Sequence, residues 1–533
     1  TYTCLRKLED TVLNELRKGQ TGFILGDEEE TGKRVSLNQF YGIEINDFAV
    51  TVAETALWIS RLKANGETSM FYDAGGDDFP LSEKAHIVEG NALRIDWNSV
   101  LPAAECNYIM GNPPFVGYSN HSAEQQKDRA SLFGKVKTVD YVACWYKKAA
   151  DYISNLPIYC AFVSTNSICQ GQQVQPIWEP LFNSGIHIDF AWQSFIWSSE
   201  ASLQAHVYVV IVGFSRMGIN QRLLFLKNGN RQSCVNINGY LQPAINVFID
   251  KRNQPLCDVP EVSKGFQATD NGFLLMYQEG YEKLISVDPS AQKWIRPFSM
   301  GADFIKRKPR YCIWLYKVNP SQFRQNPEIM ERVKKVQEFR LSSPSKITNK
   351  KAERPTEFDE IRDSSDDYLA FPKVSSENRR YVPIDYLSRE VIPGDKLFMV
   401  PNASLYDFGI LTSNVHMAWM RTVAGRMKSD YSYSNTVVYN NFPIPEFTDK
   451  QKEKISNTAK AILDARNLYP DTSFADLYDE LTMPVELRRA HQANDKAVME
   501  AYGLTKIVDG KKTWLTESET VAKLFEMYKE ITK

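Results

Sequence analysis

The chain has 533 residues, of which 43% are hydrophobic, and its formal net charge is −2 at pH 7. Such a length and composition predict a globular protein with two or three domains. The longest apolar run, over residues 207–212, is far shorter than a membrane span, and the eight cysteines include no Cys-x-x-Cys pair, so we expect a cytoplasmic protein with reduced cysteines rather than a membrane protein, a zinc protein or a disulfide framework.

Strands and helices alternate along the first 214 residues. Residues 1–18 repeat apolar side chains at helical spacing and predict an amphipathic helix. An acidic loop at 27–33 and a Gly/Asp-rich connection at 66–80 are expected between elements. Further helices are expected at 47–64 and 140–154, and strands at 39–45, 86–90, 108–111, 158–164, 186–192 and 206–214. This alternation predicts an α/β fold with a doubly wound parallel sheet, whose ligands lie at the carboxyl ends of the strands.

The pattern changes to short strands, turns and loops after residue 218. Asn228-Gly229 and Asn238-Gly239 are turn signals, and proline-rich connections continue to Pro445. Helical patterns return near the end of the chain, at residues 449–468, 483–501 and 515–531. We therefore expect three regions: an α/β domain over 1–218, an α+β domain over 219–445 and a helical region over 446–533.

Positive charge is concentrated in one part of the second region. Residues 303–354 contain 14 Lys/Arg and 5 Asp/Glu, a local surplus of +9 in a chain whose total is −2. This polarity is typical of a protein that presents one face to double-stranded DNA. The candidate phosphate contacts are Lys306, Arg307, Lys308 and Arg310, together with Lys334 and Arg340 on an expected basic helix at 327–340.

The stretch Asn112-Pro113-Pro114-Phe115 directly follows the expected strand 108–111. An exocyclic amine such as N6 of adenine is a poor nucleophile because its lone pair is conjugated into the ring. An Asn side-chain oxygen and a Pro carbonyl can accept hydrogen bonds from both of its N–H groups, and consecutive prolines restrict the backbone that aims them. The Phe ring supplies a flat surface for a base swung out of the duplex. These residues predict a site for amine methylation.

Two more polar side chains follow strands of the same expected sheet. Glu44 ends the strand at 39–45, and a carboxylate in this position can accept hydrogen bonds from both hydroxyls of a ribose. Asn91 follows the strand at 86–90, where a side-chain amide can bind the edge of an adenine ring. Spacings of 47 and 21 residues separate Glu44, Asn91 and Asn112. The three positions together predict a nucleoside cofactor beside the amine site.

The order Glu, Asn, Asn-Pro-Pro-Phe resembles the N6-adenine DNA methyltransferases, whose fourth motif is Asn-Pro-Pro-Phe or Asn-Pro-Pro-Tyr. This resemblance implies a Rossmann-like class I methyltransferase sheet and S-adenosylmethionine as cofactor. It further implies that Glu44 binds the cofactor ribose, that Asn91 and Ala92 bind the cofactor adenine, and that Ile45 also belongs to the cofactor-binding residues. Asn112 to Phe115 would then be the catalytic residues that hold the flipped target base.

Five further stretches are similar to the MmeI-like type IIL restriction-modification family. They are Phe162–Ser167, Trp192–Phe195, Ile295–Phe298, Ser434–Pro443 and Leu481–Pro484. The resemblance then covers nearly the whole chain. It implies the methyltransferase portion of a bacterial restriction-modification enzyme, with residues 219–445 as its target-recognition domain.

One family motif is missing. The first motif, a loop of the Asp-Pro-Ala-Cys-Gly-Ser-Gly-Asn-Phe type that cradles the cofactor, is absent, and no Gly-x-Gly occurs among the 27 glycines. In the family this loop directly precedes a helix like residues 1–18. We therefore expect a fragment that lacks an amino-terminal segment and the first strand of the sheet. Alone, it is expected to bind the cofactor poorly or not at all and to be inactive.

Three alternatives stay open. An N4-cytosine methyltransferase uses the same amine chemistry, and a non-catalytic DNA-binding or specificity module would fit if the natural protein also lacks the cofactor loop. RNA or protein methylation fits less well with a domain that resembles target-recognition domains.

Three other kinds of site are set aside on the residues. Gly26–Lys33 resembles a phosphate loop, but Arg34 replaces the Ser or Thr that would bind magnesium. No cysteine follows a proline, which argues against a C5-cytosine methyltransferase. The six histidines form no ligand cluster, so no metal site is expected.

Overall fold

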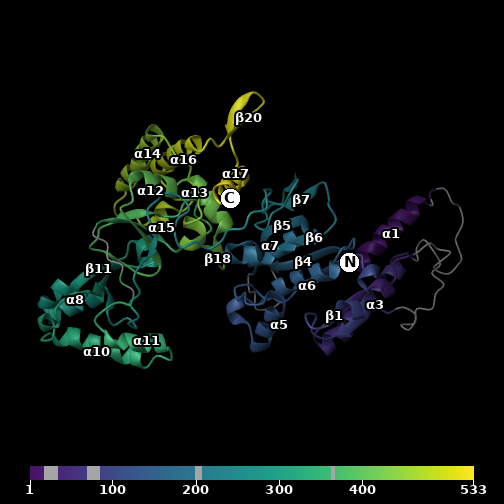
Figure 1. Cartoon of the computed structure of the whole chain (residues 1–533), viewed down its shortest axis with the longest axis horizontal. Coiled ribbons are helices and arrows are strands. Elements are labelled where there is room, and N and C mark those ends of the chain that lie inside the picture. Colours follow the sequence, from purple (N-terminus) through teal and green to yellow (C-terminus); the bar gives the residue numbers. More distant parts are fainter. Residues whose placement is uncertain (17, 19–33, 69–83, 198–206, 360, 362–365) are drawn as a thin grey trace. The chain divides into compact units, whose positions relative to one another are not determined.

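The computed structural model describes residues 1–16, 18, 34–68, 84–197, 207–359, 361 and 366–533 (Figure 1). The acidic loop expected at 27–33, with the stretch that resembles a phosphate loop, and most of the connection expected at 66–80 lie outside these residues. The chain divides into two compact units. Unit 1 contains residues 1–163, 181–187 and 213–218, and unit 2 contains residues 164–180, 188–212 and 219–533.

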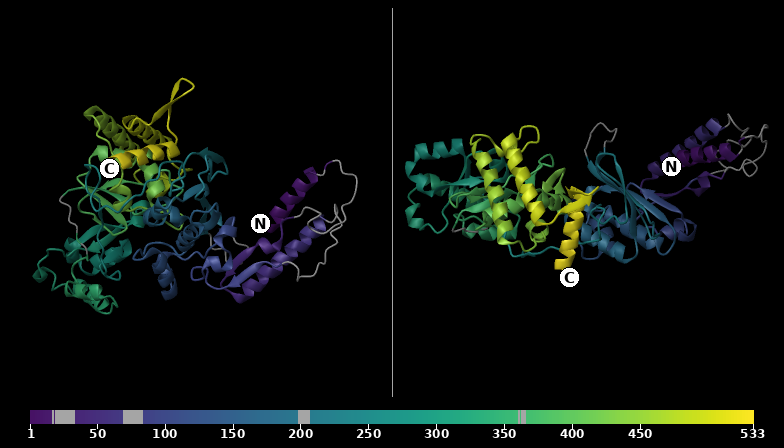
Figure 2. Two further views of the ribbon diagram at one scale, coloured as in Figure 1. Left: turned by 45° about the vertical axis from the view of Figure 1, so that its right-hand side comes forward. Right: turned by 90° about the horizontal axis from the view of Figure 1, so that it is seen from above.

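Unit 1 begins with two helices and a small parallel sheet. Strands β1 (Tyr41–Glu44) and β2 (His86–Glu89) pair in parallel, with Glu44 opposite Glu89. Helices α1 (Tyr2–Leu16) and α3 (Asp47–Thr68) lie side by side (Figure 2). Tyr2, Leu37 and Ala64 form their small core. The expected apolar side of α1 is not the buried one: Leu8 is 60% exposed and Leu16 is 76% exposed, whereas Tyr2 and Arg6 are buried.

The larger sheet has six strands in the order β3-β4-β6-β5-β7-β8. Strand β3 pairs in parallel with β4, β5 pairs in parallel with β7, and β7 pairs with β8 in an antiparallel turn at Asn228-Gly229. The strands are β3 (Tyr108–Gly111), β4 (Tyr159–Thr165), β5 (His187–Trp197), β6 (Val207–Ser215), β7 (Arg222–Phe225) and β8 (Arg231–Cys234). The predicted α/β fold is confirmed. The expectation of one sheet is wrong, because the strands expected at 39–45 and 86–90 form the separate β1–β2 sheet. The larger sheet continues past residue 218, since β7 and β8 belong to it.

Helices between these strands carry buried aromatic packing. The helices are α4 (Trp97–Val100), α5 (Ala123–Phe133), α6 (Ala143–Ile153) and α7 (Val174–Asn183). In unit 1, Tyr146 of α6 contacts Phe162 edge-on and stacks on Phe214, with ring centroids 5.3 Å apart in both pairs. This cluster holds α6 against the strands that follow β3, so the segment leading into α6 is fixed relative to the end of β3.

Short strands and helices fill the middle of the chain, as the sequence predicts. Three small sheets have the orders β10-β12-β11-β16, β15-β13-β17-β9 and β14-β19-β18. Their strands are β9 (Ser263–Lys264), β10 (Leu275–Tyr277), β11 (Ile295–Ser299), β12 (Arg310–Ile313), β13 (Tyr368–Pro372), β14 (Val374–Ser375), β15 (Asp385–Leu387), β16 (Ile392–Pro393), β17 (Leu397–Pro401), β18 (Gly425–Met427) and β19 (Asp430–Ser432). The helices are α8 (Gln278–Val287), α9 (Gly301–Lys306), α10 (Pro327–Leu341), α11 (Lys346–Lys350), α12 (Leu405–Leu411) and α13 (Asn414–Val423).

The carboxyl-terminal region is helical, as expected, with one addition. Helices α14 (Asp449–Asn467), α16 (Val485–Ala501) and α17 (Glu517–Ile531) match the three predicted helical patterns, and a short helix α15 (Phe474–Leu477) lies outside them. A hairpin of β20 (Thr505–Val508) and β21 (Lys511–Trp514), not expected from the sequence, separates the last two helices (Figure 1). Its Asp509-Gly510 turn has positive φ at both residues. Within the described residues, no helix is long and apolar enough to span a membrane.

Candidate active site

The Asn112-Pro113-Pro114-Phe115 loop starts where the ladder of β3 ends, at Gly111. Asn112 is exposed, Pro113 is buried and Phe115 is half-buried. Among the described residues, nothing hydrogen-bonds the Asn112 side chain or the Pro113 carbonyl. The two acceptors expected to bind an amine are therefore left unused by the protein itself, next to an aromatic ring.

The loop is anchored just beyond Phe115. The Val116 carbonyl accepts a hydrogen bond from the Tyr141 N–H at 2.9 Å, and the Tyr118 N–H donates to the Asp140 carboxylate at 2.8 Å. The His121 Nε2 atom lies 3.3 Å from the same Val116 carbonyl. Burial lowers the pKa of His121, so the ring is neutral and can donate one N–H to this oxygen. Residues 140 and 141, directly before α6, thus hold the loop in place.

Glu44 and Ile45 lie at the carboxyl end of β1. One carboxylate oxygen of Glu44, Oε1, accepts hydrogen bonds from the Ile45 N–H at 2.8 Å and the Asn46 N–H at 3.3 Å. This fixes the carboxylate at the start of α3 and leaves Oε2 without a partner among the described residues. The Ile45 side chain is 68% exposed. The pair therefore offers one free carboxylate oxygen beside an uncovered apolar side chain.

Asn91 lies at the same edge of the β1–β2 sheet as Glu44. The Gly90 N–H donates to the Glu44 carbonyl at 2.7 Å, which places Asn91 one residue beyond that contact. The Asn91 side-chain oxygen accepts from the Leu93 N–H at 2.9 Å, and its amide nitrogen donates to the Asp128 carboxylate at 3.3 Å. Among the described residues, the second amide N–H of Asn91 donates no hydrogen bond to a carbonyl or carboxylate, although the Asn91 amide also lies beside the Tyr141 hydroxyl and acts to lower its pKa.

The backbone after Asn91 is held independently of that side chain. The Lys148 ammonium donates to the carbonyls of Leu93 and Ile95 at 2.8 and 2.6 Å, and the Trp97 indole N–H donates to the Ala92 carbonyl at 2.9 Å. Residues 91–97 form a loop whose carbonyl groups are bound by side chains from α4 and α6. The loop is therefore rigid without a ligand.

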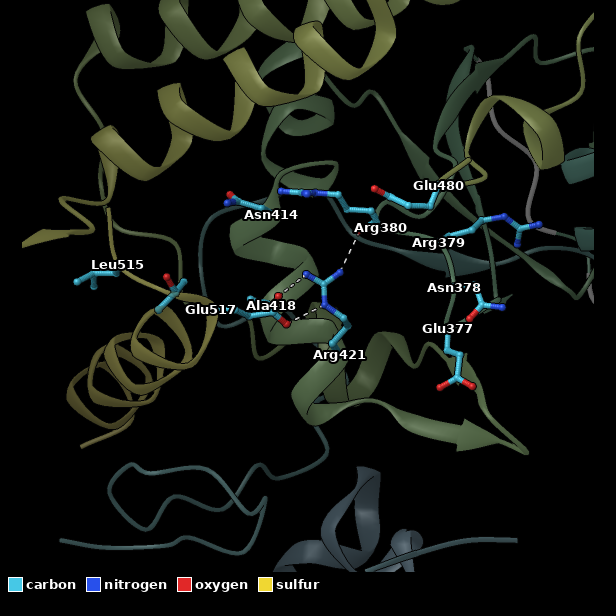
Figure 3. Close-up of a pocket in the computed structure, with 11 residues that line it drawn as sticks. Glu377, Asn378, Arg379, Arg380, Asn414, Ala418, Arg421, Glu480, Leu515 and Glu517 are labelled. Carbon is cyan, nitrogen blue, oxygen red and sulfur yellow. Dashed lines mark hydrogen bonds and ion pairs between the residues drawn. The ribbon is translucent and has the colours of Figure 1, made fainter. Parts of the chain in front are cut away.

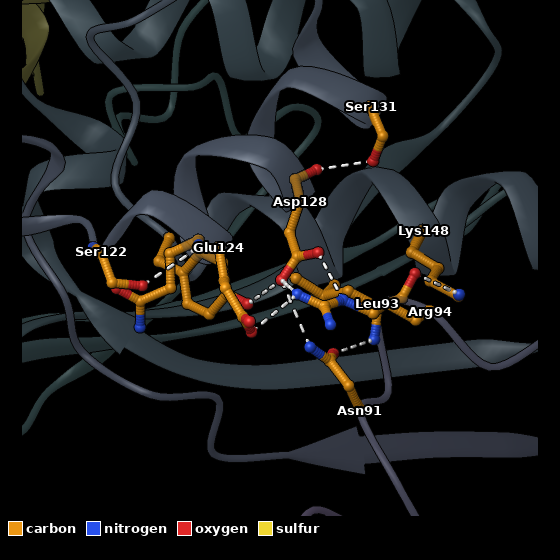
Figure 4. Close-up of polar contacts among 10 residues, drawn as sticks. Asn91, Leu93, Arg94, Ser122, Glu124, Asp128, Ser131 and Lys148 are labelled. Carbon is orange, nitrogen blue, oxygen red and sulfur yellow. Dashed lines mark hydrogen bonds and ion pairs between the residues drawn. The ribbon is translucent and has the colours of Figure 1, made fainter.

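The Asp128 carboxylate on α5 is hydrogen-bonded to several polar side chains of this region (Figure 4). Its carboxylate accepts from Arg94 Nε at 2.8 Å, from the Tyr141 hydroxyl at 2.8 Å and from the Asn91 amide. Burial by itself raises the pKa of Asp128, but the hydrogen bonds from Arg94, Tyr141 and Asn91 outweigh it and hold the pKa below its ordinary value. Asp128 is consequently a buried carboxylate that stays ionised at neutral pH.

The residues at the β1–β2 edge fit part of a nucleoside. A free carboxylate oxygen on Glu44 matches the hydroxyls of a ribose, and a fixed amide N–H on Asn91 matches an acceptor on an adenine edge. In the described part of the chain, no three His, Cys, Asp or Glu side chains are grouped to hold a metal ion. The structure thus brings Glu44 and Asn91 together, while Asn112 follows a strand of the other sheet.

The predicted DNA contact Arg340 is wrong. Its side chain is 1% exposed, and all five of its N–H groups donate to backbone carbonyls at 2.8 to 3.0 Å. The five acceptors are the carbonyls of Ala268, Thr269, Lys351, Arg354 and Glu357. Val333 and Val336 share the buried face of α10 with Arg340, at spacings of seven and four residues. That spacing is a sequence signal that could have placed Arg340 in the core.

The other basic candidates divide into two groups. Arg307 donates to three carbonyls of residues 469–472 and lies over the Phe474 ring, while Arg310 pairs with the buried Asp303 at 3.2 Å. Both guanidinium groups are engaged within the protein. Lys306 and Lys308 are exposed and form no ion pair with a described residue, and Lys334 is 75% exposed, with Glu338 3.9 Å away. These lysines keep their charge available to solvent.

A cavity of about 480 Å³ lies in unit 2, lined by residues of α13 and of the loop 377–380 (Figure 3). Arg421 inside it is bound to both carboxylate oxygens of Glu517 at 2.8 and 2.9 Å. Arg379 and Arg380 point in opposite directions in Figure 3. Because its charged groups are paired or diverge, this cavity does not present a converging site for one ligand.

Comparison with known proteins identifies the family. Sequence models of three MmeI domains match consecutive parts of the chain: the DNA-methyltransferase domain over residues 1–226, the target recognition domain over 243–446 and the C-terminal domain over 447–533. The solved structure of the type IIL restriction-modification enzyme MmeI in complex with DNA is similar over 100% of this chain and 71% of that chain, with 41% identity and a TM-score of 0.88. The chain belongs to the MmeI-like type IIL restriction-modification family.

The chain is also similar to a bacterial DNA methyltransferase. DNA methyltransferase A of Bacillus subtilis strain 168 is 35% identical over 539 residues, which include 100% of this chain and 60% of the relative. The chain thus spans about three fifths of the length of that curated protein. In the MmeI-like chain, the Asn-Pro-Pro-Phe loop lies in the part matched by the methyltransferase domain, and the exposed lysines lie in the part matched by the target recognition domain.

The sequence analysis did not single out Asp128, Arg94 or Tyr141, and it predicted no helix between residues 112 and 139, where α5 lies. The signal for α5 was present: Ser122 and Gln125 form a capping box, each side chain bonded to the other residue's N–H. With α5 recognised as a helix, Asp128 falls where its side chain can face α6.

We predict that replacing Arg340 with Met destabilises the protein by about 3 to 5 kcal/mol, because five carbonyls around a buried side chain lose their charged donor. The denaturant midpoint of unfolding measures this. The matched control, Lys334→Met on the exposed face of the same helix, should change stability by less than about 0.5 kcal/mol. An R340M protein with normal stability and weakened DNA binding would show instead that Arg340 contacts DNA.

Proposed function

We propose that the protein containing this chain transfers a methyl group from S-adenosylmethionine to N6 of adenine in duplex DNA, as the methyltransferase of a restriction-modification system in the bacterial cytoplasm. The observation that carries this proposal is the pair of unused acceptors at Asn112 and Pro113 beside the half-buried Phe115. Membership in the MmeI-like family supports it, because a methyltransferase domain and a target recognition domain match the chain.

The proposed roles of the loop follow from amine chemistry. With the target adenine swung out of the duplex and stacked on Phe115, the Asn112 side-chain oxygen and the Pro113 carbonyl accept the two N6–H groups. Drawing both hydrogens to one side favours a pyramidal nitrogen, whose lone pair then points away from the ring plane. No strong base is needed for this step, so orientation and acceptor placement carry the rate.

The residues proposed to bind the cofactor lie at the edge of the β1–β2 sheet. S-adenosylmethionine supplies an electrophilic methyl group on a sulfonium when it is bound. In this proposal Glu44 Oε2 accepts from a ribose hydroxyl, and Ile45 covers one face of the adenine. The second amide N–H of Asn91, with the backbone at Ala92, binds the edge of the same ring.

The exposed lysines are the proposed phosphate contacts. Lys306, Lys308 and Lys334 lie in the part matched by the target recognition domain, and their ammonium groups face solvent. They would position the duplex without reading its sequence. The similar MmeI structure is described as a complex with DNA, which supports a DNA partner for this chain.

We also propose that the glycine-rich cofactor loop and the first strand of the sheet come from sequence outside these 533 residues. Among the described residues, β1 pairs with β2 and no other strand, and β3 pairs with β4 and no other strand. Strand β3, an edge strand of the six-stranded sheet within the described residues, exposes 71% of Tyr108 and 57% of Met110. A parallel strand added to these edges would cover such side chains, which supports the proposal.

A second candidate is a non-catalytic DNA-binding or specificity module. The absence of any Gly-x-Gly in the chain favours it, since a cofactor without its cradle binds weakly. Cofactor binding by the complete protein separates this candidate from the methyltransferase.

Replacing Asn112 with Ala in the complete protein is expected to lower methylation by at least about a hundredfold, the usual effect of losing one preorganised group at a reacting centre. DNA binding should be unchanged. Transfer of labelled methyl groups to DNA and gel-shift affinity measure the two quantities. Asn120→Ala, an exposed Asn eight residues along the chain, is the control and should keep full activity. Retained turnover in N112A rules out the proposed role.

Charge neutralisation should weaken DNA binding in a salt-dependent way. With Lys306, Lys308 and Lys334 all replaced by Gln, the slope of log affinity against log salt should become shallower by about 2.7, or about 0.9 for each lost phosphate contact. Replacing Lys454, Lys460 and Lys523, three exposed lysines of the carboxyl-terminal helices, is the charge-matched control. Equal slopes for the two triple variants would remove these lysines from the interface.

Calorimetric titration with S-adenosylmethionine tests the origin of the cofactor loop. We expect no measurable binding to the 533-residue chain and micromolar binding to the complete protein. Micromolar binding by the 533 residues alone would show that the outside segment is not needed. Absence of binding by the complete protein as well would favour the non-catalytic module.

A further inference from the structure

Asp128 accepts hydrogen bonds from three residues of two separate segments through one carboxylate. Arg94 and Asn91 come from the loop after β2, and Tyr141 comes from the segment just before α6. The Asp128 side chain is 8% exposed, whereas that of Arg94 is 50% exposed. Figure 4 shows the Arg94 and Asn91 side chains pointing toward the Asp128 carboxylate. The arrangement joins two parts of unit 1 that no strand ladder connects within the described residues.

The Tyr141 contact extends the connection to the loop after β3. The Tyr141 hydroxyl donates to Asp128, and the Tyr141 backbone N–H donates to the Val116 carbonyl. Burial and the hydrogen bond to Asp128 raise the pKa of Tyr141 above its usual range, so its hydroxyl keeps its proton and stays a donor. One residue thus touches both Asp128 and the segment that continues from Phe115.

The hydrogen bonds of Asp128 fix the orientation of the Asn91 side chain rather than the path of the backbone after it. Lys148 and Trp97 already bind the carbonyls of Ala92, Leu93 and Ile95. Without Asp128 the loop would still be held, but the Asn91 amide would keep only its bond to the Leu93 N–H and could rotate. Burying a carboxylate is unfavourable unless its oxygens are bonded, and packed apolar groups can stabilise a core equally well. A buried charge in this position therefore points to a requirement for fixed geometry.

We propose that Asp128 is a positioning residue, which orients the Asn91 amide for the adenine of the methyl donor and ties that amide, through Tyr141, to the loop carrying Asn112. This inference rests on the proposed function. Asp128 itself need not touch a substrate. It sets the relation between the donor's adenine and the target base, on which an in-line transfer depends.

Two variants and one matched control test the role. Asp128→Asn keeps the volume and removes the charge, and Tyr141→Phe removes one hydrogen bond to Asp128. The control is Tyr152→Phe, because the Tyr152 hydroxyl of α6 donates to the Leu101 carbonyl at 2.7 Å, outside the Asp128 cluster. Tyr152→Phe removes a comparable bond, so it reports the purely structural effect of such a loss.

The first measurement is amide hydrogen exchange of the 533-residue chain without any cofactor. The Leu93 N–H is bonded to the Asn91 side chain, so freeing that side chain should expose it. We expect Leu93 to exchange about tenfold faster in D128N and a few-fold faster in Y141F, with no change in Y152F. Wild-type exchange at Leu93 in D128N would overturn the proposal, and so would equal acceleration in Y152F.

The second measurement is calorimetric affinity of the complete protein for S-adenosylmethionine. D128N should bind about tenfold more weakly, Y141F a few-fold more weakly, and Y152F as the wild type. Unchanged affinity in D128N would contradict the positioning role even if the variant were less active. If the wild-type protein does not bind the cofactor, the proposed function fails, while the exchange measurement still decides whether Asp128 orients Asn91.

Discussion

The proposed site depends on the hydrogen bonds between residues 140 and 141 and the loop after β3. The ladder between β3 and β4 ends at Gly111, so the next residues have no strand partner to fix them. Tyr141 and Asp140 supply fixed points at Val116 and Tyr118, and two prolines restrict the backbone between. As a result Asn112 and Pro113 can leave their acceptors unbonded without the loop becoming free to move. A site that binds a polar group must leave such acceptors without hydrogen bonds and must also fix their positions.

The basic residues show how differently arginine and lysine are used in one region. The Arg340 guanidinium has five donors in a planar fork, and five carbonyls around it accept all of them. Arg307 and Arg310 are likewise engaged with protein groups, while Lys306, Lys308 and Lys334 face solvent. The positive surplus of residues 303–354 is therefore partly internal. A count of charges overstates the part of it that a phosphate can reach.

Helices and strands were predicted well where the spacing of apolar residues and the order of elements along the chain indicate the same structure. The strands that carry Glu44, Asn91 and Asn112, the basic helix α10 and the three last long helices all lie close to their expected positions. Helix α5 was missed because its sequence is polar, and the β20–β21 hairpin because it is short and inserted between two helices. The exposed side of α1 could not be foreseen, since periodicity shows that a helix has an apolar side but not what covers it.

The site itself was predictable only in part. Residue type and the positions of strand ends predicted that Glu44 and Asn91 lie at one edge. The role of Asp128 depends on its contacts with residues 34 and 37 positions away, which spacing does not reveal. The sequence around Arg340 supports two interpretations: a charge on the surface of a basic helix, and a position on the apolar face of that helix. The second interpretation is correct. Tertiary contacts thus decided which polar residues serve the fold and which stay available for a ligand.

The central claim is that the open acceptors at Asn112 and Pro113 receive the amino group of adenine. Mass analysis of nucleosides from DNA treated with the complete protein and S-adenosylmethionine tests it most directly. The account predicts N6-methyladenine as the modified nucleoside. N4-methylcytosine, or DNA without any modified base, would contradict it.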